Sequence, residues 1–136
     1  MFEYVTPFYN NVAGVKMNLW GELPAFVFVN EKFYLVSNLL FDTILPIKEG
    51  YSACKTFVPP DEIRDNKWGF VKVVPDKTND TVYLEDAIPF VYDECGSFKN
   101  GLAYFCKRGA AYDIEGYLDY DGKVIWQTER KKKQTD

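Results

Sequence analysis

The feature that most constrains the fold of this chain is an internal repeat that occurs three times. Each copy has an aromatic residue, an acid, four further residues and a large apolar residue, and the copies start at residues 2, 41 and 92. Because each unit of a repeat array packs against its neighbours, the same position of each copy is expected in an equivalent buried site. These positions are Phe2 and Phe8 in the first copy, Phe41 and Ile47 in the second, and Tyr92 and Phe98 in the third.

A turn residue and a second apolar strand follow each of these segments. An Asn or a Gly stands third after the large apolar residue, at Asn11, Gly50 and Gly101. These residue types tolerate positive φ and are therefore typical of turns. The spacing of the copies is uneven, and the extra length falls in 57–66 and 75–80, which carry the Pro, Asp and Asn residues of surface loops.

The segments between the turn residues favour β-strands. Asp121-Gly122 stands between two short strand-like segments and is typical of a type I′ hairpin turn. Residues 69–74 and 81–84 indicate a second hairpin with a longer loop. No window of a dozen residues keeps its apolar residues at helical spacing. The sequence therefore predicts an all-β fold, in which the repeats form a small curved or solenoid-like antiparallel sheet structure.

Three motifs recur together in the second half of the chain. They are Lys67-Trp68-Gly69-Phe70-Val71, Ile88-Pro89-Phe90-Val91-Tyr92-Asp93 and Phe98-Lys99-Asn100-Gly101-Leu102-Ala103. In this order they resemble the bacterial WG-repeat family. Elsewhere the similarity is weaker: Phe33-Tyr34 stands where tryptophan-glycine is expected, and Glu115-Gly116, followed by Tyr117, keeps only the glycine. The resemblance implies an array of β-hairpins that acts as an interaction module, without an agreed catalytic site.

The residues of these motifs also have a physical interpretation of their own. A glycine within a strand is expected where a large neighbour lies across the backbone, and we expect Trp68 to cover Gly69. The acids after the aromatic residue, Glu3, Asp42 and Asp93, are suited to accept backbone N–H groups of the turn that follows. A catalytic residue is needed once, whereas a turn-stabilising residue is needed in every repeat. We therefore assign these acids a structural role.

The chain of 136 residues contains no histidine, which excludes several classes of active site. A Ser-His-Asp triad, a Cys-His pair and a His-containing zinc site all need an imidazole. Cys54, Cys95 and Cys106 form no C-x-x-C pair, which favours reduced, buried thiols and a cytoplasmic protein. The N-terminal residues suggest neither a signal peptide nor a membrane anchor. Phosphate-binding and calcium-binding loop motifs are also missing, so we expect no cofactor, no metal and no enzymatic activity.

The charge balance favours a protein partner over nucleic acid. The chain has 20 acidic and 16 basic side chains, and its net charge of -4 repels a phosphate backbone. Aromatic residues make up 18% of the chain, so some tyrosines are expected at the surface, where they suit protein contacts. We expect a basic partner to bind one side of the array, formed by a tyrosine-bearing face and the two long loops. The residues assigned to this surface are Asp61, Glu62, Asp76, Asp80, Tyr83, Glu85 and Asp86.

These observations lead to three hypotheses about function. The first is a non-enzymatic binding module, and its sharper form is a toxin-neutralising immunity or inhibitor protein that covers a basic active site. The second is a small hydrolase or carbohydrate-binding protein that uses Asp and Glu, although no unrepeated pair of acids supports it. The third is a fragment or scaffold of a longer repeat protein. In each case we expect a single domain over residues 1–128 and a charged, solvated tail over residues 129–136.

Overall fold

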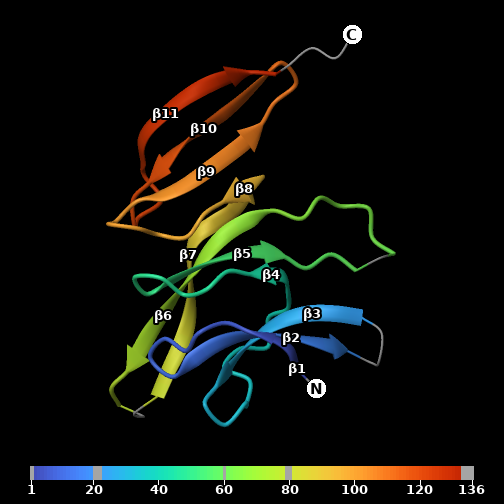
Figure 1. Ribbon diagram of the computed structural model, residues 1–136, viewed down its shortest axis with the longest axis vertical. Helices are drawn as coiled ribbons and strands as arrows, with labels where there is room; N and C mark the ends of the chain where they lie inside the picture. Colours follow the sequence, from blue (N-terminus) through green and yellow to red (C-terminus); the bar gives the residue numbers. More distant parts are fainter. Residues whose placement is uncertain (1, 20–22, 60, 79–80, 133–136) are drawn as a thin grey trace.

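The computed structural model describes residues 2–19, 23–59, 61–78 and 81–132, and every regular element among them is a β-strand (Figure 1). The side chains of Phe2 and Glu3 and the whole of Asp80 lie outside the described residues. The strands are β1 (Phe2–Val5), β2 (Val12–Leu19), β3 (Leu23–Asn30), β4 (Phe41–Ile44), β5 (Tyr51–Thr56), β6 (Trp68–Asp76), β7 (Thr81–Tyr92), β8 (Glu94–Cys95), β9 (Ala103–Arg108), β10 (Tyr112–Leu118) and β11 (Val124–Lys131).

The strands form two antiparallel sheets that follow the order of the sequence. One sheet has the order β1-β2-β3-β4-β5-β6-β7 and the other has the order β11-β10-β9-β8. Neighbours in the sequence are neighbours in space, as expected when short loops join antiparallel strands. The strands are stacked along the longest axis of the molecule, with β1–β3 at one end and β9–β11 at the other (Figure 1). The predicted all-β, antiparallel repeat fold is confirmed.

Three equivalent units build this array. Unit 1 comprises residues 2–40, unit 2 residues 41–91 and unit 3 residues 92–131, and each begins with a short strand, a tight turn and a longer strand. The strand register confirms that the units are equivalent, because it pairs the same position of each unit with the same partner position. These pairs are Gly14 with Phe28, Ala53 with Phe70, and Tyr104 with Tyr117.

The register also corrects the alignment of unit 1. Phe26-Val27 of β3, and not Phe33-Tyr34, occupies the place of Trp68-Gly69 in β6. Phe33-Tyr34 lies on the return segment after β3, which an isolated bridge between Val29 and Leu35 holds in place. The sequence-based alignment is wrong here because Phe26-Val27 shares no residue type with the motif. Only strand pairing shows the equivalence.

Tight turns join the first two strands of each unit, as predicted. Asn11, Gly50 and Gly101 have φ angles of 68°, 87° and 81°. The residue before each of them also has a positive φ, as a type I′ turn requires at both central positions. The prediction of a turn residue at the third place is therefore confirmed in all three units.

The hairpin at Asp121-Gly122 is present, but its turn differs from the predicted type. Gly122 has a φ of 79°, whereas Asp121 has no positive φ, so the turn is not type I′. A hydrogen bond of 3.0 Å from the Gly122 N–H to the Asp119 carbonyl oxygen closes a longer turn. The Asp119 carboxylate accepts hydrogen bonds from the N–H groups of Asp121 and Lys123, both at 2.9 Å, and stabilises this turn.

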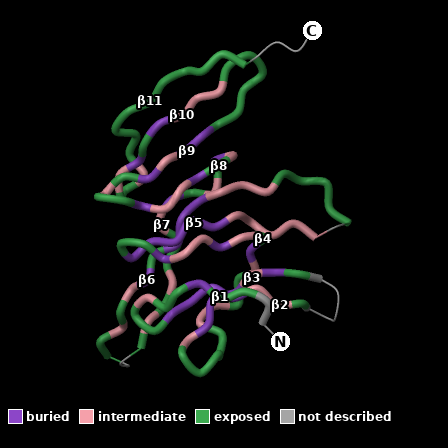
Figure 2. The backbone as a smooth tube through the Cα atoms, in the orientation of Figure 1, coloured by how far each residue is buried: buried purple, intermediate pink, exposed green. Residues whose placement is uncertain are grey.

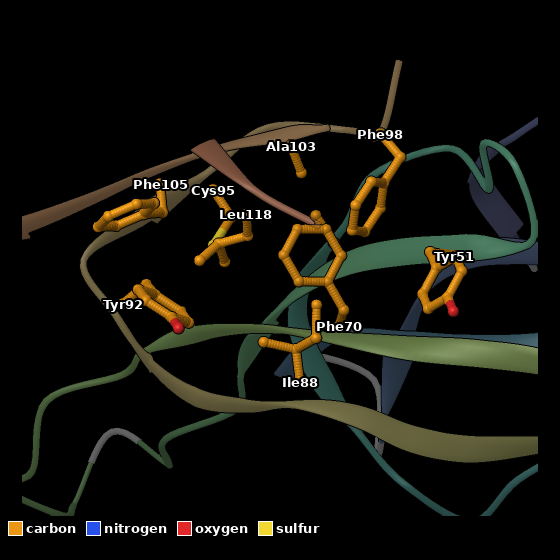
Figure 3. Close-up of a cluster of buried hydrophobic side chains, with 10 residues drawn as sticks. Tyr51, Phe70, Ile88, Tyr92, Cys95, Phe98, Ala103, Phe105 and Leu118 are labelled. Carbon is orange, nitrogen blue, oxygen red and sulfur yellow. The ribbon is translucent and has the colours of Figure 1, made fainter. Parts of the chain in front are cut away.

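The two larger clusters of buried apolar side chains each join consecutive units. Their residues are among those coloured as buried in Figure 2. Between units 2 and 3, the Phe98 ring centroid lies 4.9 Å from that of Tyr51 and 5.0 Å from that of Phe70 (Figure 3). Between units 1 and 2, the ring of Phe28 packs edge-on against Phe41 at 5.8 Å. A unit of a few strands cannot bury both of its faces alone, so the stacking of units creates the core.

The repeat positions are buried in units 2 and 3 but not throughout unit 1. Phe41 and Tyr92 are buried, and Ile47 and Phe98 are only 5% and 2% exposed, whereas Phe8 is 43% exposed. The prediction of equivalent buried sites is therefore wrong for Phe8. The reason is that Ile47 and Phe98 pack towards the preceding unit, and no unit of the described chain lies on that side of Phe8.

The end of the described chain belongs to the sheet rather than to a separate tail. β11 continues to Lys131, which pairs with Tyr112, and Arg130 pairs with Asp113. The Asp113 carboxylate also lies 3.7 Å from the Arg130 guanidinium and 3.6 Å from Lys132 Nζ. The predicted tail is therefore wrong for residues 129–132, because the basic side chains of β11 pair with an acid across the sheet.

The stacking of units 2 and 3 predicts the effect of truncating Phe98. Phe98→Ala is expected to lower the free energy of unfolding by about 3–5 kcal/mol, because it removes a fully buried ring. The measurement is urea unfolding followed by circular dichroism. Phe8→Ala is the matched control at the equivalent position, and we expect a loss of only about 1 kcal/mol there. Equal losses for the two variants would contradict this account of the core.

Candidate interaction surface

Three residues assigned to partner binding meet on one face of the ribbon formed by β6 and β7. In the register, Asp76 pairs with Thr81 and Lys72 pairs with Glu85, and Tyr83 lies between these pairs. Alternate residues of a strand point to the same face, so Asp76, Tyr83 and Glu85 share a face. Tyr83 and Glu85 are both exposed. This face therefore carries two acids, Asp76 and Glu85, and the exposed ring of Tyr83, with Lys72 directly opposite Glu85.

The other residues assigned to this surface lie elsewhere. Asp86 is exposed, pairs with Val71 and follows Glu85 directly, so it points to the opposite face of the ribbon.

Asp61 and Glu62 lie in the loop before β6, whereas the turn of the ribbon follows β6 (Figure 1). The nine residues of β6 separate the two loops by about 30 Å. The prediction that both loops form one side is wrong, because they flank the same strand. Asp80 lies outside the described residues.

An open groove of about 610 Å³ lies between the ribbon and the turns of unit 1. Asn10, Asn30 and Tyr34 line it from unit 1, and Pro75 and Val82 line it from the ribbon. The ring of Tyr34 is largely exposed. A mixed lining of amide, aromatic and aliphatic groups in an open groove suits contact with another protein better than the enclosure of a small molecule.

Asp93 accepts hydrogen bonds from two partners outside the turn that follows it. Its Oδ2 accepts the Arg108 N–H at 2.6 Å, and its Oδ1 lies 2.5 Å from Lys67 Nζ. Burial alone would raise the pKa of the Asp93 carboxyl, but these hydrogen bonds and the charges of Lys67 and Arg108 hold it below its usual value. The hydrogen bond to Asp93 in turn raises the pKa of Lys67. An ion pair therefore links units 2 and 3.

Asp42 also departs from the predicted role of stabilising the next turn. Its Oδ2 accepts a hydrogen bond of 3.1 Å from the Thr43 hydroxyl and lies 4.0 Å from Lys55 Nζ. The turn after Asp42 is closed by its own backbone, with a hydrogen bond of 2.8 Å from the Lys48 N–H to the Tyr51 carbonyl oxygen. The prediction is therefore wrong for Asp42 and Asp93, because their carboxylates bind other partners instead of the N–H groups of the turn that follows.

A family model of the WG containing repeat matches residues 1–18 and 87–109 of the chain. The first match covers the start of unit 1, and the second covers the junction of units 2 and 3. The chain therefore contains WG-repeat segments. Neither a curated protein nor a solved structure shows a significant match to it. Among the described residues, no helix is long and apolar enough to span a bilayer, and no group of three or more Cys, Asp or Glu residues is placed to hold a metal ion.

The glycine of the WG repeat makes room for the following strand. A Cβ added to Gly69 would lie 2.7 Å from the Phe90 ring and 2.8 Å from the Ile88 carbonyl oxygen. The equivalent Cβ on Gly116 would collide with the carbonyl oxygen of a residue in β11. A large neighbour does cross Gly69 as predicted, but it is Phe90 and not Trp68. Trp68 points away because adjacent residues of a strand face opposite sides.

Sequence reasoning missed Glu49, which connects the turns of units 2 and 3. Its carboxylate accepts hydrogen bonds from the N–H groups of Asn100 at 2.7 Å and Gly101 at 2.8 Å, and from the Tyr120 hydroxyl at 2.5 Å. The hydrogen bond from Tyr120, followed by those from the amides, lowers the pKa of Glu49. The one signal in the sequence was a glutamate at the turn position where the other units have Asn10 and Asn100. Its partners are distant in sequence and carry no pattern.

The three cysteines are free and buried, as predicted. Burial raises the pKa of Cys54 and of Cys95 to about 12, because a thiolate in the core would lose its hydration. Cys106 is also buried, and burial raises the pKa of its thiol. All three therefore act as small core side chains rather than as nucleophiles.

The contacts of Glu49 predict a pH-dependent contribution to stability. A carboxylate whose pKa is lowered by folding stabilises the native state above its ordinary pKa of 4.5, and this stabilisation is lost as the pH falls through the lowered value. Glu49→Gln should therefore be less stable than the wild type at pH 7, and the difference should shrink below about pH 4.5. Urea unfolding at several pH values measures it. A difference that stays constant down to pH 3 would contradict a role for the charge.

The burial of the cysteines predicts slow thiol chemistry in the native state. With a thiol reagent at pH 8, the native chain should react at least about a hundredfold more slowly than the chain in denaturant, because thiolate formation and access are both suppressed. The release of a coloured thiolate product measures the rate, and the unfolded chain should show all 3 thiols. Rapid reaction of one thiol in the native chain would identify a reactive cysteine and contradict the assignment.

Proposed function

We propose that this chain is a non-enzymatic protein-binding module whose β6–β7 ribbon contacts a basic partner. The observation that carries the proposal is the shared face of Asp76, Tyr83 and Glu85 on this ribbon. An exposed tyrosine with an acid on either side along the ribbon combines an apolar ring with charges that steer a positively charged surface. The open groove with the exposed ring of Tyr34 is a separate surface, because Pro75 and Val82 point to the opposite face of the ribbon.

The repeated acids bind other groups of the protein, which supports a role without catalysis. Asp93 is held by Lys67 and a backbone amide, and Asp42 by Thr43 and Lys55. A general acid or base needs a free carboxyl facing bound substrate, and neither side chain offers one. The raised pKa of the buried thiols likewise argues against a cysteine nucleophile.

A sharper form of the proposal is an inhibitor or immunity protein that neutralises a toxin in the cytoplasm. The small size of the chain and its net charge of -4 support this role, since an acidic surface can cover a basic active site. Long-range attraction of this kind accelerates association and weakens as salt screens the charges. If the ribbon binds the toxin, loss of its acids should therefore lower the association rate.

The experiment compares two variants that remove the same number of charges at opposite ends of β6. Asp76→Asn with Glu85→Gln alters the ribbon, and Asp61→Asn with Glu62→Gln is the control in the other loop. Wild-type chain first captures its partner from a host extract, and the association rate of the purified pair is then measured at low and high salt. We expect the ribbon variant to associate roughly tenfold more slowly at low salt and the control to resemble the wild type.

Two outcomes would contradict the proposal. Equal slowing by both variants would show that only net charge matters, and no slowing by either would show that the ribbon is not the contact surface. Tyr83→Ala separates the ring from the charges, because loss of a contact ring should mainly accelerate dissociation. Urea unfolding of each variant confirms that the fold is retained.

A further inference from the structure

The strand β7 forms one edge of the seven-stranded sheet. It pairs with β6 on one side, and among the described residues no strand pairs with its other side. β7 lies in the middle of the chain, between β6 and unit 3, and runs beside β6 in the long ribbon of Figure 1. An unpaired edge presents a row of backbone N–H and C=O groups that can bind another extended segment.

The hydrogen bonds of β6 show which groups of β7 face the open side. The Val73 N–H donates to the Gly50 carbonyl oxygen at 2.9 Å, so the backbone groups of Val73 point away from β7. Val73 stands opposite Leu84, and Pro75, which has no N–H, stands opposite Val82. Two opposite residues of an antiparallel pair either bind each other or both point away. The N–H and C=O groups of Val82 and Leu84 therefore point to the open side of β7.

The sequence of this edge favours the addition of a strand. Residues 81–84 are Thr, Val, Tyr and Leu, and the first three of these prefer β-strands. None of the four is a lysine or a proline, which are residues that commonly block an exposed edge. The register with β6 is regular from Thr81 to Asp86 and shifts only beyond Asp86. Residues 81–86 therefore offer a regular edge of about 20 Å.

A strand added to this edge can contact both faces of the ribbon. On one face, its alternate side chains lie beside Tyr83 and Glu85. On the other face, they lie beside Val82 and Leu84, and Val82 lines the groove of about 610 Å³ together with Tyr34 of unit 1. The groove and the face of Tyr83 lie on opposite sides of the ribbon, and a single extended segment has side chains for both.

The charges of β7 select a basic segment. Glu85 and Asp86 are exposed, and residues 81–86 include no basic side chain. Lys72 stands opposite Glu85 in β6 and offsets part of its charge, whereas Asp86 stands opposite Val71. Opposite charges across two strands stabilise a sheet, and like charges destabilise it. A second copy of this chain is disfavoured as the added strand, because it has a net charge of -4 and brings the same two acids.

We propose that β7 binds an extended segment of the basic partner as an additional antiparallel strand along residues 81–86, with two adjacent Lys or Arg residues opposite Glu85 and Asp86. The inference rests on the proposed function, since it names the part of the partner that contacts the ribbon. Hydrogen bonds to the backbone of Val82 and Leu84 hold the segment, and the two basic residues fix its register. The antiparallel direction continues the pattern of the sheet and is the more stable pairing.

The probe is a synthetic peptide, Lys-Arg-Val-Tyr-Val-Thr, with blocked ends and a fluorescent dye. In the proposed register, its residues stand opposite residues 86 to 81 in that order. Its binding to the full chain is measured by fluorescence polarisation. One modified peptide carries N-methyl groups on both valines, whose N–H groups face Leu84 and Val82. The matched control carries N-methyl groups on the arginine and the tyrosine, whose N–H groups point away from β7.

The two modified peptides should differ in affinity. N-methylation of the valines should weaken binding at least about tenfold, because two hydrogen bonds to β7 are lost. The control peptide should bind nearly as well as the unmodified peptide. Failure of the unmodified peptide to bind at roughly millimolar concentration would overturn the proposal. Equal affinities of the two modified peptides would also overturn it, and would leave side-chain contact with a basic partner intact.

A peptide with Glu in place of its Lys and Arg tests the charges separately. We expect it to bind at least about tenfold more weakly than the basic peptide at low salt. Equal binding of the two would contradict the proposed function and the choice of a basic segment, even if N-methylation of the valines still prevents binding. Sedimentation of the chain alone tests the second copy as the occupant, and a dimer that Val82→Pro dissociates would overturn the proposal.

Hydrogen exchange locates the bound strand on the chain. Without peptide, the N–H groups of Val82 and Leu84 should exchange at least about tenfold faster than those of Tyr83 and Glu85, which face β6. The peptide should slow exchange at Val82 and Leu84. Val82→Pro removes one outward N–H and should weaken binding, whereas Val82→Ala keeps it and is the matched control. If Val82→Pro fails to fold, exchange and the N-methylated peptides decide, and unchanged exchange at both residues in the complex would overturn the proposal.

Discussion

The burial of aromatic rings between consecutive units is the interaction on which the structure depends. A ribbon of a few antiparallel strands has two faces and too little apolar surface to fold independently. Phe98 inserted between Tyr51 and Phe70 gives the ribbons of units 2 and 3 a common interior. The Lys67–Asp93 ion pair and the contacts of Glu49 with the next turn are also made between units. The contacts between units therefore determine both the stability of the fold and the arrangement of the units.

Surfaces available for function arise where this stacking is extended or interrupted. The β6–β7 ribbon is long enough to carry an acidic, tyrosine-bearing face outside the contact between units. At the two ends of the array, positions equivalent to buried ones remain exposed, as at Phe8 and Tyr117. A repeat fold thus separates the residues that hold the units together from those that can bind partners, because only nearest neighbours share an interface.

The sequence predicted features that depend on local backbone chemistry and missed those that depend on distant partners. The turns at Asn11, Gly50 and Gly101 were predicted because few residue types tolerate positive φ. Glu49 was missed because its partners are about fifty residues away. The role of Asp93 was assigned to the wrong partner for the same reason. The strand that separates the two long loops was also missed, so their acids were expected on one side of the array.

The sequence by itself determined that the chain is an all-β array of three repeat units, because repeated turn residues and strand-like segments act over short distances. Tertiary structure alone decided which positions are equivalent, as Phe26-Val27 and Trp68-Gly69 show. It also decided that Phe8 is exposed while Phe98 is buried, although both occupy the same place in the repeat. The physical reason is that burial belongs to the contact between two units rather than to the residue. This position becomes part of the core only where a neighbouring unit covers it.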